Sequence, residues 1–194
     1  MDLEQRITQQ FADHIETITT AASLTAPIAR AASSIVESLL RGGKVISCGN
    51  GGSAAASQHF MAKMVHRFER ERPGLPAVAI SAGSSTMTSV ADEISYDRVF
   101  SQQVSALAHP GDVLLAISCS GNSNNLLRAV EAAEERQMTV VALTGNDGGQ
   151  LAGMLREQDV EIRVPTESVS RIQETQLLVI HCLCDLIDVQ LLGS

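Results

Sequence analysis

The sequence predicts an α/β fold in which a parallel β-sheet lies between helices on both of its faces, in three layers. Short apolar runs rich in β-branched residues recur along the chain, and segments with helical periodicity separate them. The runs are apolar throughout, as at 113–117, which is typical of strands buried on both faces. Strands that alternate with helices in this way indicate a parallel sheet covered on both sides.

The first 42 residues are predicted to form an N-terminal segment of two helices. Apolar residues recur at helical spacing from Ile7 to Ile18, and a second such pattern follows Pro27, which suits a first helical turn. Gly42 and Gly43 then form a typical helix stop. Both helices have wide apolar faces, and exposed faces of that size usually mark an interface, so we expect them to pack in an oligomer.

Residues 43–194 are predicted to form the α/β core of a single domain that spans 1–194, a length that suits one hydrophobic core. In such sheets, ligands bind beyond the carboxyl ends of the strands, where polar loops are expected here. The helix that ends near residue 68 is expected to continue into a solvated charged end, Glu69–Arg72. The expected strands are 45–48, 77–80, 112–117, 139–143 and 160–164, and the expected helices are 54–68, 84–91, 99–107, 124–137 and 168–192.

Composition and charge argue against several classes of protein. A net charge of −8 and an isoelectric point near 5.0 disfavour a duplex nucleic-acid binder, which needs a basic surface. Aromatic residues make up 3% of the chain, too few for stacking on single strands. No apolar run approaches the roughly 18 residues of a membrane span, and the first residues do not resemble a signal peptide. We therefore expect a cytoplasmic protein without direct nucleic-acid or membrane partners.

Four cysteines, Cys48, Cys119, Cys182 and Cys184, could pair as disulfides, but no feature of the sequence indicates secretion. Buried structural thiols are the preferred interpretation. Cys182 and Cys184 lie two positions apart on a predicted helix and point to nearly opposite sides. We therefore do not expect these two thiols to share a metal ion.

The strongest local signal for a ligand site is Ser118-Cys119-Ser120-Gly121-Asn122-Ser123, between a predicted strand and a predicted helix. Hydroxyls and a glycine meet there at a helix N-terminus, where free backbone donors and the positive end of the helix dipole suit a phosphate. The alternative is a simple capping loop with Ser123 as the N-cap. Phosphate binding is the favoured interpretation, because an acidic chain must bind anions through such local donors.

A second segment, Cys48-Gly49-Asn50-Gly51-Gly52-Ser53, also leads from a strand into a helix. Its glycines permit positive φ angles and a close approach of the backbone to a ligand. It is not a Walker loop, which needs Gly-Lys-Ser/Thr, and Ala54 occupies the third glycine position of the GxGxxG fingerprint. Two glycine- and serine-rich loops in one sheet predict an anion site more strongly than either loop alone.

These two segments, with Leu-Thr-Gly-Asn-Asp-Gly-Gly at 143–149 and Arg-Ile-Gln-Glu at 171–174, resemble the phosphoheptose isomerase family over nearly the whole chain. The resemblance implies the SIS fold, a homotetramer with sites at subunit interfaces, and a seven-carbon sugar phosphate as ligand. It also implies that four serines hold the phosphate and that Asn50 positions the sugar, with Gly51 and Cys119 in the same loops. The four serines are Ser53, Ser118, Ser120 and Ser123.

The resemblance further implies a set of catalytic residues. The active isomerases convert sedoheptulose 7-phosphate into a heptose 7-phosphate, for lipopolysaccharide heptose synthesis, by proton transfer between C1 and C2 through an enediol. His59, Gln173 and His181 match three family residues that can hold zinc. The fourth family residue is a Glu, which shares the proton transfer with the last His. Lys63 stands at the position of that Glu, so the metal set is incomplete.

Lys63 is therefore the main departure from the family pattern. A protonated lysine donates hydrogen bonds and accepts none, so it neither ligates zinc nor takes up a proton. Burial could depress its pKa and make it a base. Without the Glu, His59 can equally be a surface or interface residue and His181 a core residue. A second departure is Ala91-Asp92-Glu93, where the family usually has Asn-Asp after the Ala.

Three functions stay open at this point. The preferred hypothesis is a non-catalytic sugar-phosphate-binding protein similar to the DnaA initiator-associating protein DiaA, a branch of the same family, with the replication initiator DnaA as partner. Lys63 is the reason for this preference. The alternative is an active phosphoheptose isomerase, which the presence of His59, Gln173 and His181 supports. Sensing of another sugar phosphate is the third hypothesis.

Overall fold

The structure, a computed structural model, describes residues 2–193 and has the predicted α/β architecture. Most predicted elements are confirmed within one to three residues at each end, and the short helix α7 was not predicted. Among the described residues, the strands are Val45–Gly49 (β1), Ala77–Ala79 (β2), Val113–Ile117 (β3), Thr139–Gly145 (β4) and Val160–Val164 (β5). The helices are Leu3–Ala21 (α1), Ala22–Leu24 (η1), Thr25–Leu40 (α2), Gly52–Val65 (α3), Ser84–Glu93 (α4), Tyr96–Arg98 (η2), Ser101–Leu107 (α5), Asn124–Glu135 (α6), Gly149–Met154 (α7) and Val169–Leu192 (α8).

The sheet is parallel throughout, with the strand order β2-β1-β3-β4-β5. From β1 the chain moves to β2 at one edge and then crosses to β3 on the other side of β1. The strand order thus reverses between β1 and β3, and ligands of open parallel sheets bind at such a switch point. Gly49 and Ile117 are register partners at the carboxyl ends of β1 and β3. The loops that follow these two parallel strands therefore begin side by side.

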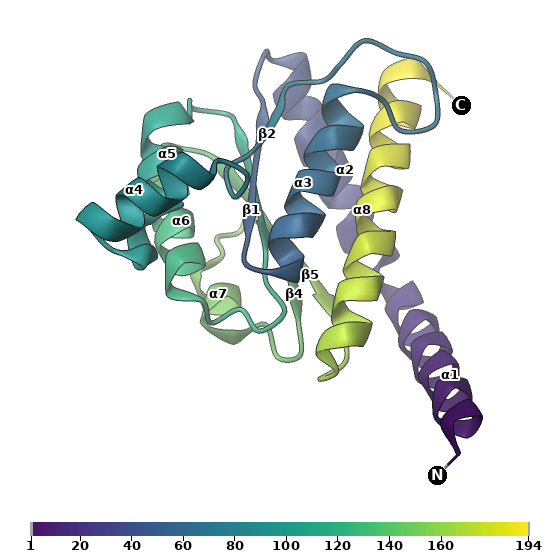
Figure 1. The fold of residues 1–194 in the computed structure, drawn as a ribbon. Coiled ribbons are helices and arrows are strands. Elements are labelled where there is room, and N and C mark those ends of the chain that lie inside the picture. Colours follow the sequence, from purple (N-terminus) through teal and green to yellow (C-terminus); the bar gives the residue numbers. More distant parts are fainter. Residues whose placement is uncertain (1, 194) are drawn as a thin grey trace.

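Helices cover both faces of the sheet, which confirms the predicted three layers (Figure 1). Successive residues of a strand face opposite sides, so each strand contributes to two cores. Leu115 of β3 packs in one core with α2, α3 and α8, whereas Leu114 packs in the other core with α5, α6 and α7. Phe60 of α3 and Phe100, at the start of α5, are fully buried in the first and second core respectively.

The longest helix, α8, belongs to the first core, where Ile180, Leu183 and Ile187 are fully buried beside α2 and α3. Its length and apolar composition would also suit a membrane span. Because its buried face packs on the sheet and on two neighbouring helices, we interpret α8 as a core helix. In contrast, α1 projects away from the body of the molecule near the first turns of α8 (Figure 1), and Ile7 and Phe11 on α1 remain exposed.

The charged segment after α3 differs from the prediction. The helix ends at Val65 and not at residue 68, and the prediction of a solvated helix end is wrong for Arg72. The Arg72 side chain is only 1% exposed, and its Nε lies 2.5 Å from Oδ1 of Asp188 on α8. Its guanidinium also donates to the carbonyl oxygens of Lys63 and Met64. Arg72 therefore caps the last turn of α3 and ties it to α8.

Candidate functional site

Two strand-to-helix loops meet at the switch point. β1 continues through Asn50 and Gly51 into α3, and β3 continues through the 118–123 loop into α6. Between the loops lies a cavity of about 160 Å³, whose lining we call the serine cradle. The structure thus brings together all the residues predicted for phosphate and sugar binding, with Gly51 at the adjacent helix start. The cradle consists of Asn50, Ser53, Ile117, Ser118, Cys119, Ser120, Ser123, Leu126 and Gln173.

The hydroxyls of the 118–123 loop are arranged to donate to an anion. Ser118 Oγ accepts the backbone N–H of Gly121 at 3.0 Å, and Ser120 Oγ accepts that of Asn122 at 3.3 Å. A serine hydroxyl has one proton and two lone pairs, so each of these oxygens still has its own proton to donate. Ser123 stands at the N-cap of α6 but makes no side-chain capping bond. The capping-loop alternative therefore does not account for this hydroxyl.

Two helix N-termini face the same cavity. Ser53 lies in the first turn of α3, and Ser123 directly precedes the first turn of α6. The first N–H groups of a helix have no partner within the helix, and the helix dipole adds a partial positive charge at that end. No side chain in the cradle carries a full positive charge. An anion would therefore be held by hydroxyls, backbone N–H groups and helix dipoles, as an acidic protein requires.

Gly121 fixes the position of the 118–123 loop against the loop after β4. Its φ is +67°, and a Cβ atom built on it would lie 1.9 Å from the carbonyl oxygen of Gly148. Asn122 Oδ1 accepts the backbone N–H of Gln150, which further joins the two loops. The 143–149 motif therefore packs against the 118–123 loop, although none of its residues lines the cavity.

Asn50 is held by a closed set of hydrogen bonds that the sequence did not predict. Its side-chain amide and that of Asn125 each donate to the other at 2.9 Å, and the Tyr96 hydroxyl donates to Asn50 Oδ1 at 3.0 Å. Asn125 is buried in the first turn of α6, so these bonds lock the β1–α3 loop onto α6. In the sequence, an asparagine beside a predicted phosphate loop is only a weak sign of such a hydrogen bond. No feature of the sequence marked Tyr96 as a partner of Asn50.

Gln173 lies at the cradle end of α3 and not with the histidines. A Cβ atom built on Gly52, the first residue of α3, would meet the Gln173 amide nitrogen at 2.5 Å, so this amide lies directly against the start of α3. His181 is eight residues further along α8, a rise of about 12 Å. The three residues predicted to hold zinc are therefore not together. Gln173 lies at the cradle end of α3, whereas His59 and His181 lie further along this helix.

His59 and His181 form a pair across the contact between α3 and α8. Their Nε2 atoms are 2.9 Å apart, and the ring of Phe68 lies 5.6 Å from that of His181. A hydrogen bond between two imidazole nitrogens needs one donor and one acceptor, so one ring is neutral at that atom. Burial, the His181 ring and the charge of Lys63 all lower the pKa of His59. These effects favour the neutral form of the His59 ring.

Lys63 lies one helical turn beyond His59, with its Nζ 6.0 Å from the centre of the Phe68 ring. Within residues 2–193, no three side chains of His, Cys, Asp or Glu lie together as metal ligands. The two imidazoles bond to each other, and the fourth family position holds a cation in place of a carboxylate. These residues do not fit zinc, which takes Cys, His and carboxylate ligands, so we derive no chemical step through a metal ion.

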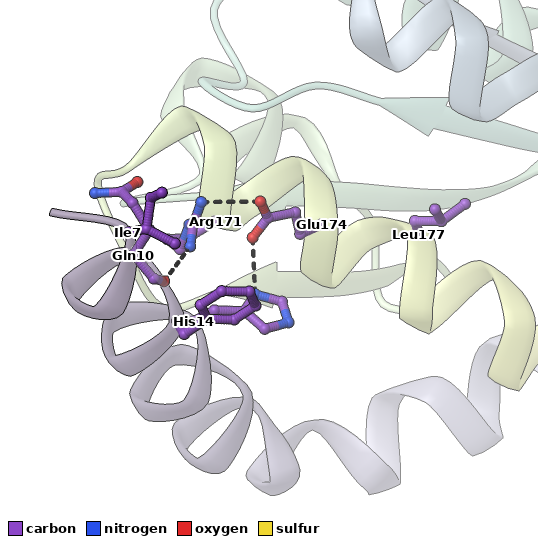
Figure 2. Close-up of a pocket in the computed structure, with 7 residues that line it drawn as sticks. Ile7, Gln10, His14, Arg171, Glu174 and Leu177 are labelled. Atoms are coloured by element: carbon purple, nitrogen blue, oxygen red, sulfur yellow. Dashed lines mark hydrogen bonds and ion pairs between the residues drawn. The ribbon is translucent and has the colours of Figure 1, made fainter. Parts of the chain in front are cut away.

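A second hollow lies outside the switch point, between α1 and α8 (Figure 2). Within it, Glu174 of α8 accepts from Arg171 at 2.9 Å and lies 2.7 Å from Nδ1 of His14 on α1. Arg171 also donates to the carbonyl oxygen of Gln10. These contacts hold α1 against α8, and the remaining lining is the apolar side chains of Ile7, Phe11 and Leu177.

Comparison with known proteins identifies the family. The family model of the SIS domain matches residues 9–145. A protein of Chromohalobacter salexigens named phosphoheptose isomerase is 53% identical over 195 residues, which cover 100% of this chain and 99% of that protein. The chain belongs to the phosphoheptose isomerase family.

Two solved structures of this family have the same fold. The phosphoheptose isomerase of Neisseria gonorrhoeae has a TM-score of 0.92 and 45% identity, covering 96% of this chain and 99% of that chain. That of Francisella tularensis has a TM-score of 0.95 and 43% identity, covering 97% and 99%. The family and the SIS fold predicted from the sequence motifs are thereby confirmed.

Proposed function

We propose that this member of the family is a sugar-phosphate isomerase that converts sedoheptulose 7-phosphate into an aldoheptose 7-phosphate. The observation that carries the proposal is that α3 joins the serine cradle at its N-terminus to the imidazole pair further along. His59 lies six positions after Ser53 on α3, a rise of about 9 Å. The extended chain from the phosphorus of a heptose 7-phosphate to its C2 has a similar length. A phosphate in the cradle would therefore bring C1 and C2 to the histidines.

The chemistry requires one group that removes and returns a proton. The imidazole of His181, to which the resemblance assigns the proton transfer, takes a proton from C1 of the ketose and leaves an enediolate with its negative charge on the C2 oxygen. The C1 hydroxyl then passes its proton through solvent to the C2 oxygen, and the His181 imidazolium delivers the proton taken from C1 to C2, which gives the aldehyde. His59, hydrogen-bonded to His181, orients the ring. The relatives named phosphoheptose isomerase support this reaction.

The test is product formation from sedoheptulose 7-phosphate by the purified protein, beside His59→Asn and His181→Asn. We expect turnover by the wild type, and a loss of about 10²- to 10⁴-fold in the rate for His181→Asn. Binding of inorganic phosphate, measured by calorimetry, should stay within about twofold, because the cradle is unchanged. A wild type that binds the sugar phosphate but forms no product would contradict the proposal.

A second candidate function is binding of the sugar phosphate without turnover, as in a DiaA-like regulator that contacts the initiator DnaA. Lys63 favours it, because the chain lacks the carboxylate that the resemblance assigns to proton transfer. Under this function, the wild type would be inert in the same assay, and immobilised protein would retain purified DnaA. Inert protein that also fails to retain DnaA would leave sensing of a sugar phosphate as the function.

We also propose that the protein assembles as a homotetramer through α1. Its apolar side chains Leu3, Ile7, Phe11 and Ile15 are between 57% and 77% exposed, on a helix that projects from the body (Figure 1). A stripe of this size is costly in water and suits packing against copies of the same chain. Analytical ultracentrifugation at micromolar concentration tests the proposal, since a monomer would contradict it.

A further inference from the structure

We propose that Lys63 takes the place of a metal ion: its ammonium group provides the positive charge beside the imidazole pair, and the site works without bound metal. The inference rests on the proposed function, because it assigns Lys63 to stabilising the oxyanion of the same reaction. It concerns the one position at which this chain replaces an expected carboxylate by a cation.

The first support is position. His59 and Lys63 are four residues apart on α3 and therefore lie on one face of the helix. The backbone of Lys63 is fixed, because Nη2 of the buried Arg72 donates to its carbonyl oxygen at 2.9 Å. The centre of the Phe68 ring lies 5.6 Å from that of His181 and 6.0 Å from the Lys63 ammonium. The ammonium therefore belongs to the same face of α3 as His59, close enough for its charge to lower the pKa of that histidine.

The second support is that the charge of Lys63 is not neutralised. The chain has two lysines. Lys44 forms an ion pair with the buried carboxylate of Asp112 at 2.5 Å. Lys63 takes part in none of the ion pairs found within residues 2–193, although it is partly buried. An unpaired cation at a partly enclosed site strongly attracts a negative group on a ligand.

The third support is that the surrounding donors are unsuited to a metal ion. Nε2 of His59 and Nε2 of His181 are bonded to each other, and the amide of Gln173 is packed against Gly52 at the cradle end of the helix. A divalent cation would have to separate the imidazoles and approach an ammonium group. Charge repulsion from that ammonium makes this unfavourable.

These contacts give Lys63 a defined role in the proposed reaction. When C1 loses its proton, negative charge develops on the C2 oxygen, and a positioned cation stabilises that charge. The ammonium donates a hydrogen bond to this oxygen and keeps its proton, so the proton balance of the reaction is unchanged. Lys63 thereby complements the His181 imidazole, which removes the proton in the proposed reaction.

The test begins with metal content, which needs no activity. Wild type, Lys63→Glu and the control Ala62→Glu are titrated with zinc against a chromogenic chelator and analysed for zinc after dialysis. We expect Lys63→Glu to hold one zinc per chain about 100-fold or more tighter than the wild type, because a carboxylate joins the two imidazoles. Ala62→Glu adds the same carboxylate at an exposed neighbouring position but leaves Lys63 in place, so it should behave as the wild type does. A wild type that binds one zinc per chain as tightly as Lys63→Glu would overturn the inference.

The second arm measures the role of the ammonium, with Lys63→Gln as the variant. In the presence of EDTA, we expect exchange of the C1 proton of sedoheptulose 7-phosphate to fall about 10²-fold in Lys63→Gln. Inorganic phosphate should bind within about twofold of the wild type. An unchanged exchange rate in Lys63→Gln would overturn the role of Lys63 while leaving the isomerase intact. No exchange in the wild type would instead contradict the isomerase, and the zinc titration would still decide the metal question.

Discussion

The two ends of α3 differ in how closely they follow the family pattern. At the N-terminal end, Ser53 joins the serines of the 118–123 loop around a preformed cavity, and every hydroxyl that the motifs predicted is in place. Toward the C-terminal end, His59 meets His181 as predicted, but Lys63 stands where a carboxylate is expected. The first end depends on backbone and hydroxyl donors, and the second on the identity of a few titratable side chains. We therefore expect that the proposed phosphate binding and the proposed proton transfer can be altered independently by substitution.

The comparison also shows how each end is stabilised. The cradle end is held by backbone contacts between Gly121 and Gly148 and by the paired amides of Asn50 and Asn125. At the other end, Phe60 and Met64 are buried in the core, and the buried side chain of Arg72 caps the last turn of α3. Substitutions at the two ends should accordingly have separable effects on binding and on turnover.

The largest expected effect is that of His181→Gln on turnover. A glutamine keeps a hydrogen-bonding amide beside His59 but cannot carry a proton, so the rate should fall about 10³-fold. The free energy of unfolding should change little, because His181 is only partly buried. Steady-state kinetics and thermal unfolding together measure both quantities. Equal loss of rate for His181→Gln and for a cradle variant such as Ser120→Ala would mean that the two ends are not separable.

The next effect is on stability at the far end of α3. Arg72→Met leaves the buried Asp188 carboxylate without its cation, which should lower the free energy of unfolding by about 3–5 kcal/mol. The matched control is Arg67→Met, whose ion pair with Glu71 is exposed and should be worth less than about 1 kcal/mol. Urea unfolding of both variants measures the difference. Similar losses for the two variants would show that the burial of Arg72 is unimportant.

A smaller loss is expected at the cradle end. Gly121→Ala introduces a Cβ atom at a positive φ and against the Gly148 carbonyl, so the two loops must separate. We expect a loss of about 2–3 kcal/mol in the free energy of unfolding and weaker phosphate binding. The control Gly153→Ala has open space at its Cβ and should leave phosphate binding unchanged. Phosphate affinity equal in both variants would contradict the proposed fixing of the loop.

The smallest effect concerns the thiols. Burial raises the pKa of both Cys48 and Cys184 to about 12. Because these thiols ionise near pH 9 when unfolded, the stability they contribute is complete below that pH and is lost as the pH rises further. At pH 8 we expect a maleimide to label Cys119, which lines the cradle, and to spare Cys48 and Cys184. Bound sedoheptulose 7-phosphate should slow labelling of Cys119, and equal rates with and without it would count against the cradle.

The sequence predicted the sheet, its two helical layers and the cradle serines, because strands, loops and helix starts leave local patterns. It did not predict contacts between distant segments. The bonds of Asn50 with Asn125 and Tyr96, and the burial of Arg72, depend on how loops and helices pack. Local charge patterns cannot distinguish a buried arginine from a solvated one. For the function, the comparisons favour the isomerase alternative over the preferred non-catalytic hypothesis, which rested mainly on Lys63.

The most direct test of the central claim is exchange of the C1 proton of sedoheptulose 7-phosphate in deuterated water, followed by NMR with EDTA present. Under this account, exchange requires proton transfer at one end of α3 while the other end holds the phosphate. The exchange measurement therefore tests both ends together. The account predicts deuterium at C1 with the wild type, and its loss by about 10³-fold with His181→Gln. Saturating binding of the sugar phosphate without any exchange by the wild type would contradict the account.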